Sequence, residues 1–177
     1  MSSAMTTLPS TEADKYGVRK YDAEDYPAVV DLWRVCFPND PPWDNPTDIV
    51  RHKLAQQPEL FLVCVVRGDL VGTVLVGYDG YRGWINKLAT HPDHQYKGVA
   101  TLLLKTAENK LIAMGCPKIN LQVRADNAEV IGLYMGAGFA VEPLISMGKR
   151  LPTGQPPTSV PGHHVLVQAS PGEQEKQ

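Results

Sequence analysis

The sequence has little net charge, few cysteines and no long apolar run, and each absence excludes a class of protein. Its 177 residues carry a formal charge of −2, so neither nucleic acid nor an anionic membrane is expected as the main partner. The three cysteines are odd in number and scattered through apolar stretches, which indicates reduced thiols. No stretch reaches membrane-spanning length, and residues 1–17 lack the apolar core of a signal peptide. The sequence therefore predicts a soluble, cytoplasmic protein.

Two phosphate-binding fingerprints and a complete metal-ligand set are also missing. The sequence contains no G-x-x-x-x-G-K-[ST] and no G-x-G-x-x-G after a first strand, which excludes P-loop and Rossmann nucleotide sites. His91 and His94 flank a Pro-Asp pair, and His163 precedes His164, but no cysteine or carboxylate cluster completes either set. No metal site is expected.

The length and the hydrophobic periodicity predict one α+β domain with a mixed sheet. Residues 1–16 are expected to be frayed, residues 17–151 to form the domain, and residues 152–177 to be a proline-rich tail in which only 163–169 is able to form a strand. The expected elements are a strand over 17–22, helices over 23–37 and 47–58, an antiparallel meander over 60–90, a helix over 98–114 with a buried stripe that includes Ala100 and Met114, a strand over 117–124, a helix over 127–138 and two short strands over 139–151.

A basic turn that contains glycine precedes the helix over 98–114. The first turn of a helix has unpaired backbone N–H groups and a partial positive charge, which together favour a bound phosphate. Gly98 allows close approach of the backbone because it has no Cβ, while Gln95 and Lys97 add side-chain donors. These features favour a diphosphate site, although Gly98 as a simple turn residue is the alternative.

Two stretches carry a resemblance to a known family. "LATHPDHQYKGVATLLL" resembles motif A of the GNAT acetyltransferases, a [QR]-x-x-G-x-[GA] loop after a strand, and "NAEVIGLYMGAGF" is similar to the segment that follows in that family. "GCPKINLQVR" and "ISMGKRL" further resemble its small bacterial YpeA-like branch. The likeness extends from about residue 18 to residue 151. It implies a GNAT fold with a mixed, mostly antiparallel central sheet flanked by helices, and an acetyl-CoA-dependent N-acetyltransferase that transfers acetyl directly to a primary amine.

The resemblance also implies which residues hold acetyl-CoA. The pyrophosphate is expected on the loop and the first helical turn, the pantetheine along the preceding strand, and Asn127 beside the cofactor arm. The implied pantetheine residues are Leu88, Ala89 and Thr90, and the implied pyrophosphate residues are Gln95, Tyr96, Lys97, Gly98, Val99, Ala100 and Thr101.

Tyr134 is the candidate catalytic residue. It follows Asn127 by seven residues, or two helical turns, so both side chains are expected to point the same way. A phenol beside the thioester sulfur protonates, or donates a hydrogen bond to, the CoA thiolate that leaves. From the residues alone a packed core tyrosine is the alternative, and the family motif favours the catalytic role.

A general base is not evident. Where relatives that acetylate protein N-termini have a carboxylate, this chain has Gln122, and an amide does not accept a proton at neutral pH. Where many family members carry a glutamate in the motif-A strand, this chain has Asn86 or Lys87. The remaining candidates are Asp79, Glu142 and His91.

Three functions therefore stay open. The first is transfer to a small-molecule or peptide amine, the second is acetylation of protein N-termini or lysines, and the third is a non-catalytic acyl-CoA sensor. Pairing of segment 163–169 with the sheet edge of a second copy would make a homodimer.

Overall fold

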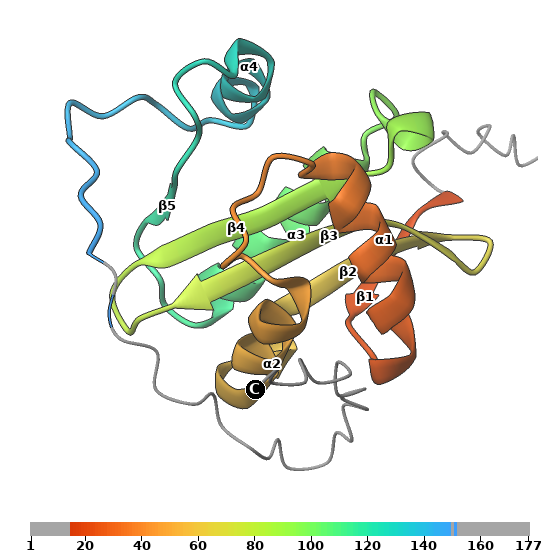
Figure 1. Ribbon diagram of the computed structural model, residues 1–177. Helices are drawn as coiled ribbons and strands as arrows, with labels where there is room; N and C mark the ends of the chain where they lie inside the picture. Colours follow the sequence, from red (N-terminus) through yellow and green to blue (C-terminus); the bar gives the residue numbers. More distant parts are fainter. Residues whose placement is uncertain (1–14, 150, 152–177) are drawn as a thin grey trace, which may run out of the picture.

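The computed structural model describes residues 15–149 and 151, which form a five-stranded sheet with helices on both faces (Figure 1). The strands are β1 (Gly17–Lys20), β2 (Phe61–Val66), β3 (Asp69–Tyr78), β4 (Gly83–Thr90) and β5 (Ile119–Leu121). The α-helices are α1 (Tyr26–Cys36), α2 (Pro46–Gln56), α3 (Val99–Ala113) and α4 (Ala128–Gly136), and the 3-10 helices are η2 (Ala23–Asp25), η3 (Pro58–Leu60) and η4 (Pro92–His94). None of the helices described is long and apolar enough to cross a membrane.

The sheet confirms the predicted mixed, mostly antiparallel arrangement. Its strand order is β1-β2-β3-β4-β5, in which the first four strands pair antiparallel and β5 runs parallel to β4. Arg67 and Gly68 take left-handed φ values of 52° and 94° in the β2–β3 turn. In the β3–β4 turn the Asp79 carboxylate accepts hydrogen bonds from the backbone N–H groups of Tyr81 and Arg82. The local turn residues therefore produce the meander that they predict.

The sheet separates two apolar layers, because successive side chains of a strand point to opposite faces. On β2, Leu62 and Cys64 belong to the core that α3 covers, while Phe61 and Val63 belong to the core beneath α1 and α2. All four side chains are fully buried. A strand with both faces apolar is what a helix on each side requires.

Helix α3 packs closely on β3 because Gly72 has no side chain. A Cβ at Gly72 would lie 2.8 Å from Val99 Cγ1 and 3.0 Å from Leu103 Cδ1. Two residues of the predicted stripe are wrong, because Ala100 is only half-buried and Met114, which lies beyond the end of α3 at Ala113, is 41% exposed. The residues that α3 buries are Val99, Leu103, Leu104, Ala107 and Leu111.

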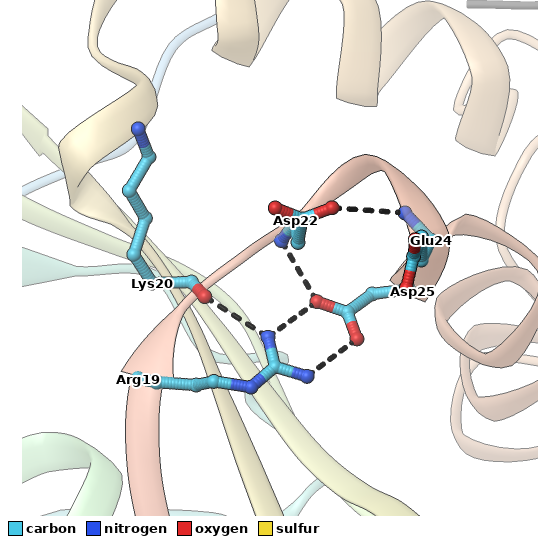
Figure 2. A network of polar contacts seen from close by, with 5 residues as sticks. All are labelled: Arg19, Lys20, Asp22, Glu24 and Asp25. Atoms are coloured by element: carbon cyan, nitrogen blue, oxygen red, sulfur yellow. Dashed lines mark hydrogen bonds and ion pairs between the residues drawn. The ribbon is translucent and has the colours of Figure 1, made fainter.

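An acidic turn connects β1 to α1. Asp22 caps η2 by accepting a hydrogen bond from the N–H of Glu24, and Asp25 accepts one from the N–H of Asp22. Arg19 donates two hydrogen bonds, of 2.6 and 2.7 Å, to the Asp25 carboxylate (Figure 2). Burial of Asp25 raises its pKa, whereas the hydrogen bonds from Arg19 and from the Asp22 N–H lower it. The hydrogen bonds together have the larger effect, so the pKa of Asp25 lies below its ordinary value. The network ties the start of α1 to β1.

The C-terminal part of the domain differs from the prediction. The strand expected over 117–124 shortens to Ile119–Leu121, the three residues that pair with β4. The two strands expected over 139–151 are wrong, since no residue described in that range lies in a strand. Its apolar side chains Val141, Leu144, Ile145 and Met147 are between 76 and 92% exposed. The alternation of apolar and polar residues in this range favours a strand. No described strand pairs with the segment, however, so it does not form one. The expectations for 1–14 and 152–177 lie outside the described residues.

Candidate functional site

The first feature of the site is an open edge on β4. The ladder between β4 and β5 ends at the pair Ile85–Leu121, so beyond this point the described part of β4 is paired only with β3. At Lys87 and Leu88 the strand bulges, because these two residues oppose the single residue Val74 of β3. Lys87 takes a left-handed φ of 48° in this bulge. The predicted pantetheine residues therefore lie on a strand edge that has backbone groups to offer.

Hydrogen bonds from β3 and α1 hold the bulge in place. The Thr73 hydroxyl donates to the Lys87 carbonyl at 3.0 Å and accepts a hydrogen bond of 2.8 Å from the indole nitrogen of Trp33. Thr73 and Trp33 are buried, so these bonds form away from competing water. Next to the bulge, Ala89 is buried, and the buried Thr90 hydroxyl has no hydrogen-bond partner among the residues that the structure describes.

The second feature is the loop before α3, where two residues have left-handed backbones. Tyr96 has a φ of 58° and Gly98 a φ of 84°, while Lys97 lies between them. The first intrahelical bond runs from the Leu102 N–H to the Gly98 carbonyl. The N–H groups of Val99, Ala100 and Thr101 consequently have no carbonyl four residues earlier in the helix to pair with. The first turn of α3 also holds no acidic residue, so it has the geometry and charge of an anion site.

The side chains of Gln95 and Lys97 brace this loop. Gln95 donates a hydrogen bond to the Thr90 carbonyl at 3.4 Å, and Lys97 donates one to the Asp93 carbonyl at 2.8 Å. Lys97 thus contacts the loop itself, and Gln95 links the loop to the end of β4.

The third feature is a cavity of about 550 Å³ between the end of α1 and the start of α4. Asn127 lies in its wall and caps α4, since its side chain accepts a hydrogen bond of 3.2 Å from the Val130 N–H. Three carboxylates and one guanidinium line the cavity, which makes its wall acidic. The lining residues are Cys36, Phe37, Pro38, Asn39, Asp40, Arg124, Asp126, Asn127, Ala128 and Glu129.

A second cavity, of about 480 Å³, lies beside Lys87 and shares Phe37 and Asp40 with the first. The Lys87 ammonium contacts Asp40, lies 3.8 Å from Asp44 and sits 4.8 Å from the centre of the Phe37 ring. These contacts hold the loop between α1 and α2 against the β4 bulge. Sequence reasoning missed Asp40, because nothing in the local spacing connects it to a lysine 47 residues later.

Tyr134 lies in the core. It is 9% exposed, and its ring packs edge-on against Phe139 with 5.5 Å between the ring centres. Burial raises its pKa to about 12. Its hydroxyl makes no hydrogen bond within the part of the chain that the structure describes. Tyr134 does not line the 550 Å³ cavity, whereas Asn127 does, so the structure brings only one of the two α4 candidates to that wall.

The three general-base candidates lie elsewhere. Asp79 serves the β3–β4 turn, Glu142 pairs with Lys118, and His91 accepts a hydrogen bond from the Asp93 N–H at the start of η4. None of them lines either cavity. Gln122 donates a hydrogen bond to the Ser146 hydroxyl. No group of three or more His, Cys, Asp or Glu side chains that would hold a metal occurs among the described residues.

The sequence and the fold have counterparts in known proteins. The family model described as "Acetyltransferase (GNAT) family" matches residues 26–139. The chain belongs to the GNAT acetyltransferase family. An acetyltransferase of Pectobacterium atrosepticum is 44% identical over 134 residues, which cover 76% of this chain and 94% of the relative. The family assignment makes this GNAT protein an acetyltransferase, whereas its YpeA-like branch stays a prediction.

Solved structures share the GNAT fold at low identity. Ard1 from Thermoplasma volcanium aligns with a TM-score of 0.64 at 22% identity, over 72% of this chain and 84% of that chain. The aminoglycoside N-acetyltransferase AAC(6')-Iy in complex with CoA aligns with a TM-score of 0.60 at 15% identity, over 77% of this chain and 95% of that chain. These likenesses support the architecture, and the second shows that the fold accommodates CoA.

Proposed function

We propose that this GNAT protein transfers the acetyl group of acetyl-CoA directly to a primary amine. The observation that supports the proposal most is that two features lie side by side at one end of the sheet. The anion site at the start of α3 lies next to the open edge of β4, and the Gln95–Thr90 hydrogen bond joins them. A pyrophosphate attached to an amide-rich arm matches this arrangement.

In this proposal the backbone at Gly98 and the first turn of α3 bind the pyrophosphate. The arm pairs with β4 from Leu88 to Thr90, where the Thr90 hydroxyl has no other partner among the described residues. The Asn127 oxygen is used by the helix cap, which leaves its amide N–H groups to contact the arm.

Acetyl-CoA supplies the thioester carbonyl that the amine attacks. The acceptor ammonium gives one proton to solvent water, its nitrogen bonds to the carbonyl carbon and gives a second proton to water, and the carbon–sulfur bond breaks to release a thiolate. Tyr134 is the proposed donor to that sulfur. Because its pKa is raised to about 12, its phenol stays protonated at neutral pH. A phenol with so high a pKa stabilises the thiolate mainly by donating a hydrogen bond, since free thiols have pKa values near 8.5.

The acceptor side is proposed at the acidic cavity. Its three carboxylates, against one guanidinium, favour an acceptor that carries positive charge. Asp40 is the carboxylate that lines both cavities, and we place the acceptor ammonium beside it. Gln122 in place of a carboxylate weighs against a protein N-terminal acetyltransferase.

The test is a panel of monoamines, polyamines, aminoglycosides, lysine peptides and free N-terminal peptides, incubated with acetyl-CoA. Release of free CoA thiol measures transfer, mass spectrometry identifies the acetylated nitrogen, and titration calorimetry measures CoA binding separately. Acetylation of an amine supports the proposal. Binding of CoA without transfer to any amine favours the sensor function, and absence of CoA binding overturns the proposal.

A further inference from the structure

One contact joins the loop before α3 to α4. The Tyr96 hydroxyl donates a hydrogen bond to the Glu129 carboxylate, 33 residues further along the chain. Glu129 lies in the first turn of α4, and Tyr134 is the one residue of that helix that is buried. In Figure 1, α4 projects away from the sheet. The Tyr96–Glu129 contact therefore ties the first turn of α4 to the loop before α3.

The contact is made from an unusual backbone. Tyr96 has a φ of 58°, a conformation that disfavours residues with a side chain. Its side chain is 90% exposed, so burial of the ring does not offset the cost. Strained positions of this kind persist where neighbouring contacts hold them, and they concentrate at binding sites.

The position of the contact relates it to the path of the cofactor. Glu129 lines the 550 Å³ cavity, and Tyr96 is two residues from Gly98 at the start of α3. On the proposed binding mode, a ligand with its pyrophosphate on α3 and its arm directed toward that cavity would take a route between the Tyr96 loop and the first turn of α4. The contact spans this passage.

The charge of Glu129 also affects entry of the cofactor. Glu129 places a carboxylate beside the route of an anionic pyrophosphate, and the nearby Lys97 ammonium is already bonded to the Asp93 carbonyl. Like charges repel at short range. The hydrogen bond from Tyr96 thus holds an anion in the passage that a phosphate has to use.

We infer that the Tyr96–Glu129 hydrogen bond is a gate on the cofactor passage, which opens to admit acetyl-CoA and again to release CoA. Tyr96 and Glu129 are positioning residues, because they control cofactor exchange through the placement of α4. The inference rests on the proposed binding of CoA at α3 and β4.

The test is stopped-flow measurement of CoA association and dissociation rates in the full chain. Tyr96→Phe keeps the ring and the backbone and removes the hydrogen bond. Both rates should rise by the same factor, roughly 3- to 10-fold for one charge-assisted hydrogen bond, with Kd changed less than about 2-fold. Tyr81→Phe is the matched control, since Tyr81 is an exposed tyrosine in the β3–β4 turn, and it should leave both rates at the native value.

Variants of Glu129 separate the hydrogen bond from the charge. Glu129→Ala should also raise both rates, and the double variant with Tyr96→Phe should dissociate no faster than the faster single variant. Glu129→Gln keeps an acceptor oxygen and removes the charge, which weakens the hydrogen bond without abolishing it, so its dissociation rate should rise less than that of Glu129→Ala. Unchanged rates in Tyr96→Phe, or a rise in dissociation alone, would overturn the gate. Failure of the native chain to bind CoA would instead overturn the proposed function on which the gate depends.

Discussion

Among single residues, Gly98 is the position where a substitution tests the proposed phosphate site most directly. Its φ is 84°, and a Cβ added there would meet no atom of the described residues within 4 Å apart from its chain neighbours. A side chain at this position therefore projects into open space at the proposed phosphate site. A loss of CoA affinity larger than backbone strain alone explains would therefore indicate that the ligand occupies this space.

For Gly98→Val we expect CoA affinity to fall by ~10- to 100-fold, on the order of 1–3 kcal/mol, because the branched side chain occupies the approach of the pyrophosphate. Titration calorimetry measures the change. Gly80→Val is the matched control, since Gly80 also has a positive φ, of 93°, and its Cβ position is equally clear of described residues other than its chain neighbours. Both variants should lower the melting temperature, but only Gly98→Val should weaken CoA binding. Equal affinities in the two variants would remove Gly98 from the site.

Tyr134 supports a second prediction at this scale. Tyr134→Phe keeps the edge-on packing against Phe139 and removes a hydroxyl that has no hydrogen-bond partner among the described residues. Thermal stability and CoA affinity should therefore stay close to native. Turnover should drop by about 10²- to 10³-fold, the cost typical of removing one donor to a developing negative charge. Steady-state kinetics on an amine found by the panel measures kcat and the acetyl-CoA KM separately. A native kcat would leave Tyr134 as a packing residue only.

At the scale of secondary-structure elements, the network at the start of α1 is the clearest case of stability built from polar groups. Asp25 is 8% exposed and accepts hydrogen bonds from Arg19 and from the Asp22 N–H. We expect Asp25→Asn to lower the free energy of unfolding by about 2 kcal/mol at neutral pH, because hydrogen bonds to a charged group are lost. Urea denaturation provides the measurement.

The pH dependence of that loss follows from the lowered pKa of Asp25. A carboxylate whose pKa is lower in the folded state than its ordinary 3.8 stabilises the fold fully above that value. The contribution disappears as the pH falls through the folded-state pKa, so native protein and Asp25→Asn should converge in strongly acidic solution. Asp31→Asn is the control, since Asp31 pairs with Arg34 on the exposed face of α1, and exposed pairs contribute under about 1 kcal/mol. Equal losses in the two variants would contradict the assigned role of Asp25.

At the scale of the whole molecule, the domain boundary is open to test. The 134 residues that match the Pectobacterium relative cover 94% of that protein but 76% of this chain. The shared fold thus needs few residues beyond the matched region. We propose that residues 17–151 are the folding unit and that 152–177 are an addition to it.

Truncation after Leu151 should consequently leave a folded domain that binds CoA, with a melting temperature within about 2 °C of the full chain, since the polar, proline-rich composition of 152–177 does not favour burial in a core. Differential scanning calorimetry and light scattering give stability and oligomeric state together. A large drop in melting temperature, or a dimer that dissociates on truncation, would show that segment 163–169 pairs with the sheet.

The sequence by itself determined the elements whose signals are local. The turns at Arg67–Gly68 and Asp79–Gly80 and the apolar runs between them specify the β2–β3–β4 meander. Helix α3 follows from its apolar period and from the glycine before it, and the backbone geometry of the anion site comes with it. Capping, turn chemistry and helical spacing depend on residues within a few positions of one another, which is why they are visible in the sequence.

Only the tertiary structure decided the features that depend on distant partners. The alternating residues over 139–151 form no described strand, and β5 is only as long as its pairing with β4. The ion pair of Lys87 with Asp40 and the Tyr96–Glu129 hydrogen bond join residues 47 and 33 positions apart. Propensity gives a segment its preferred shape, but pairing, burial and cavities require a second surface, and folding alone brings that surface to it.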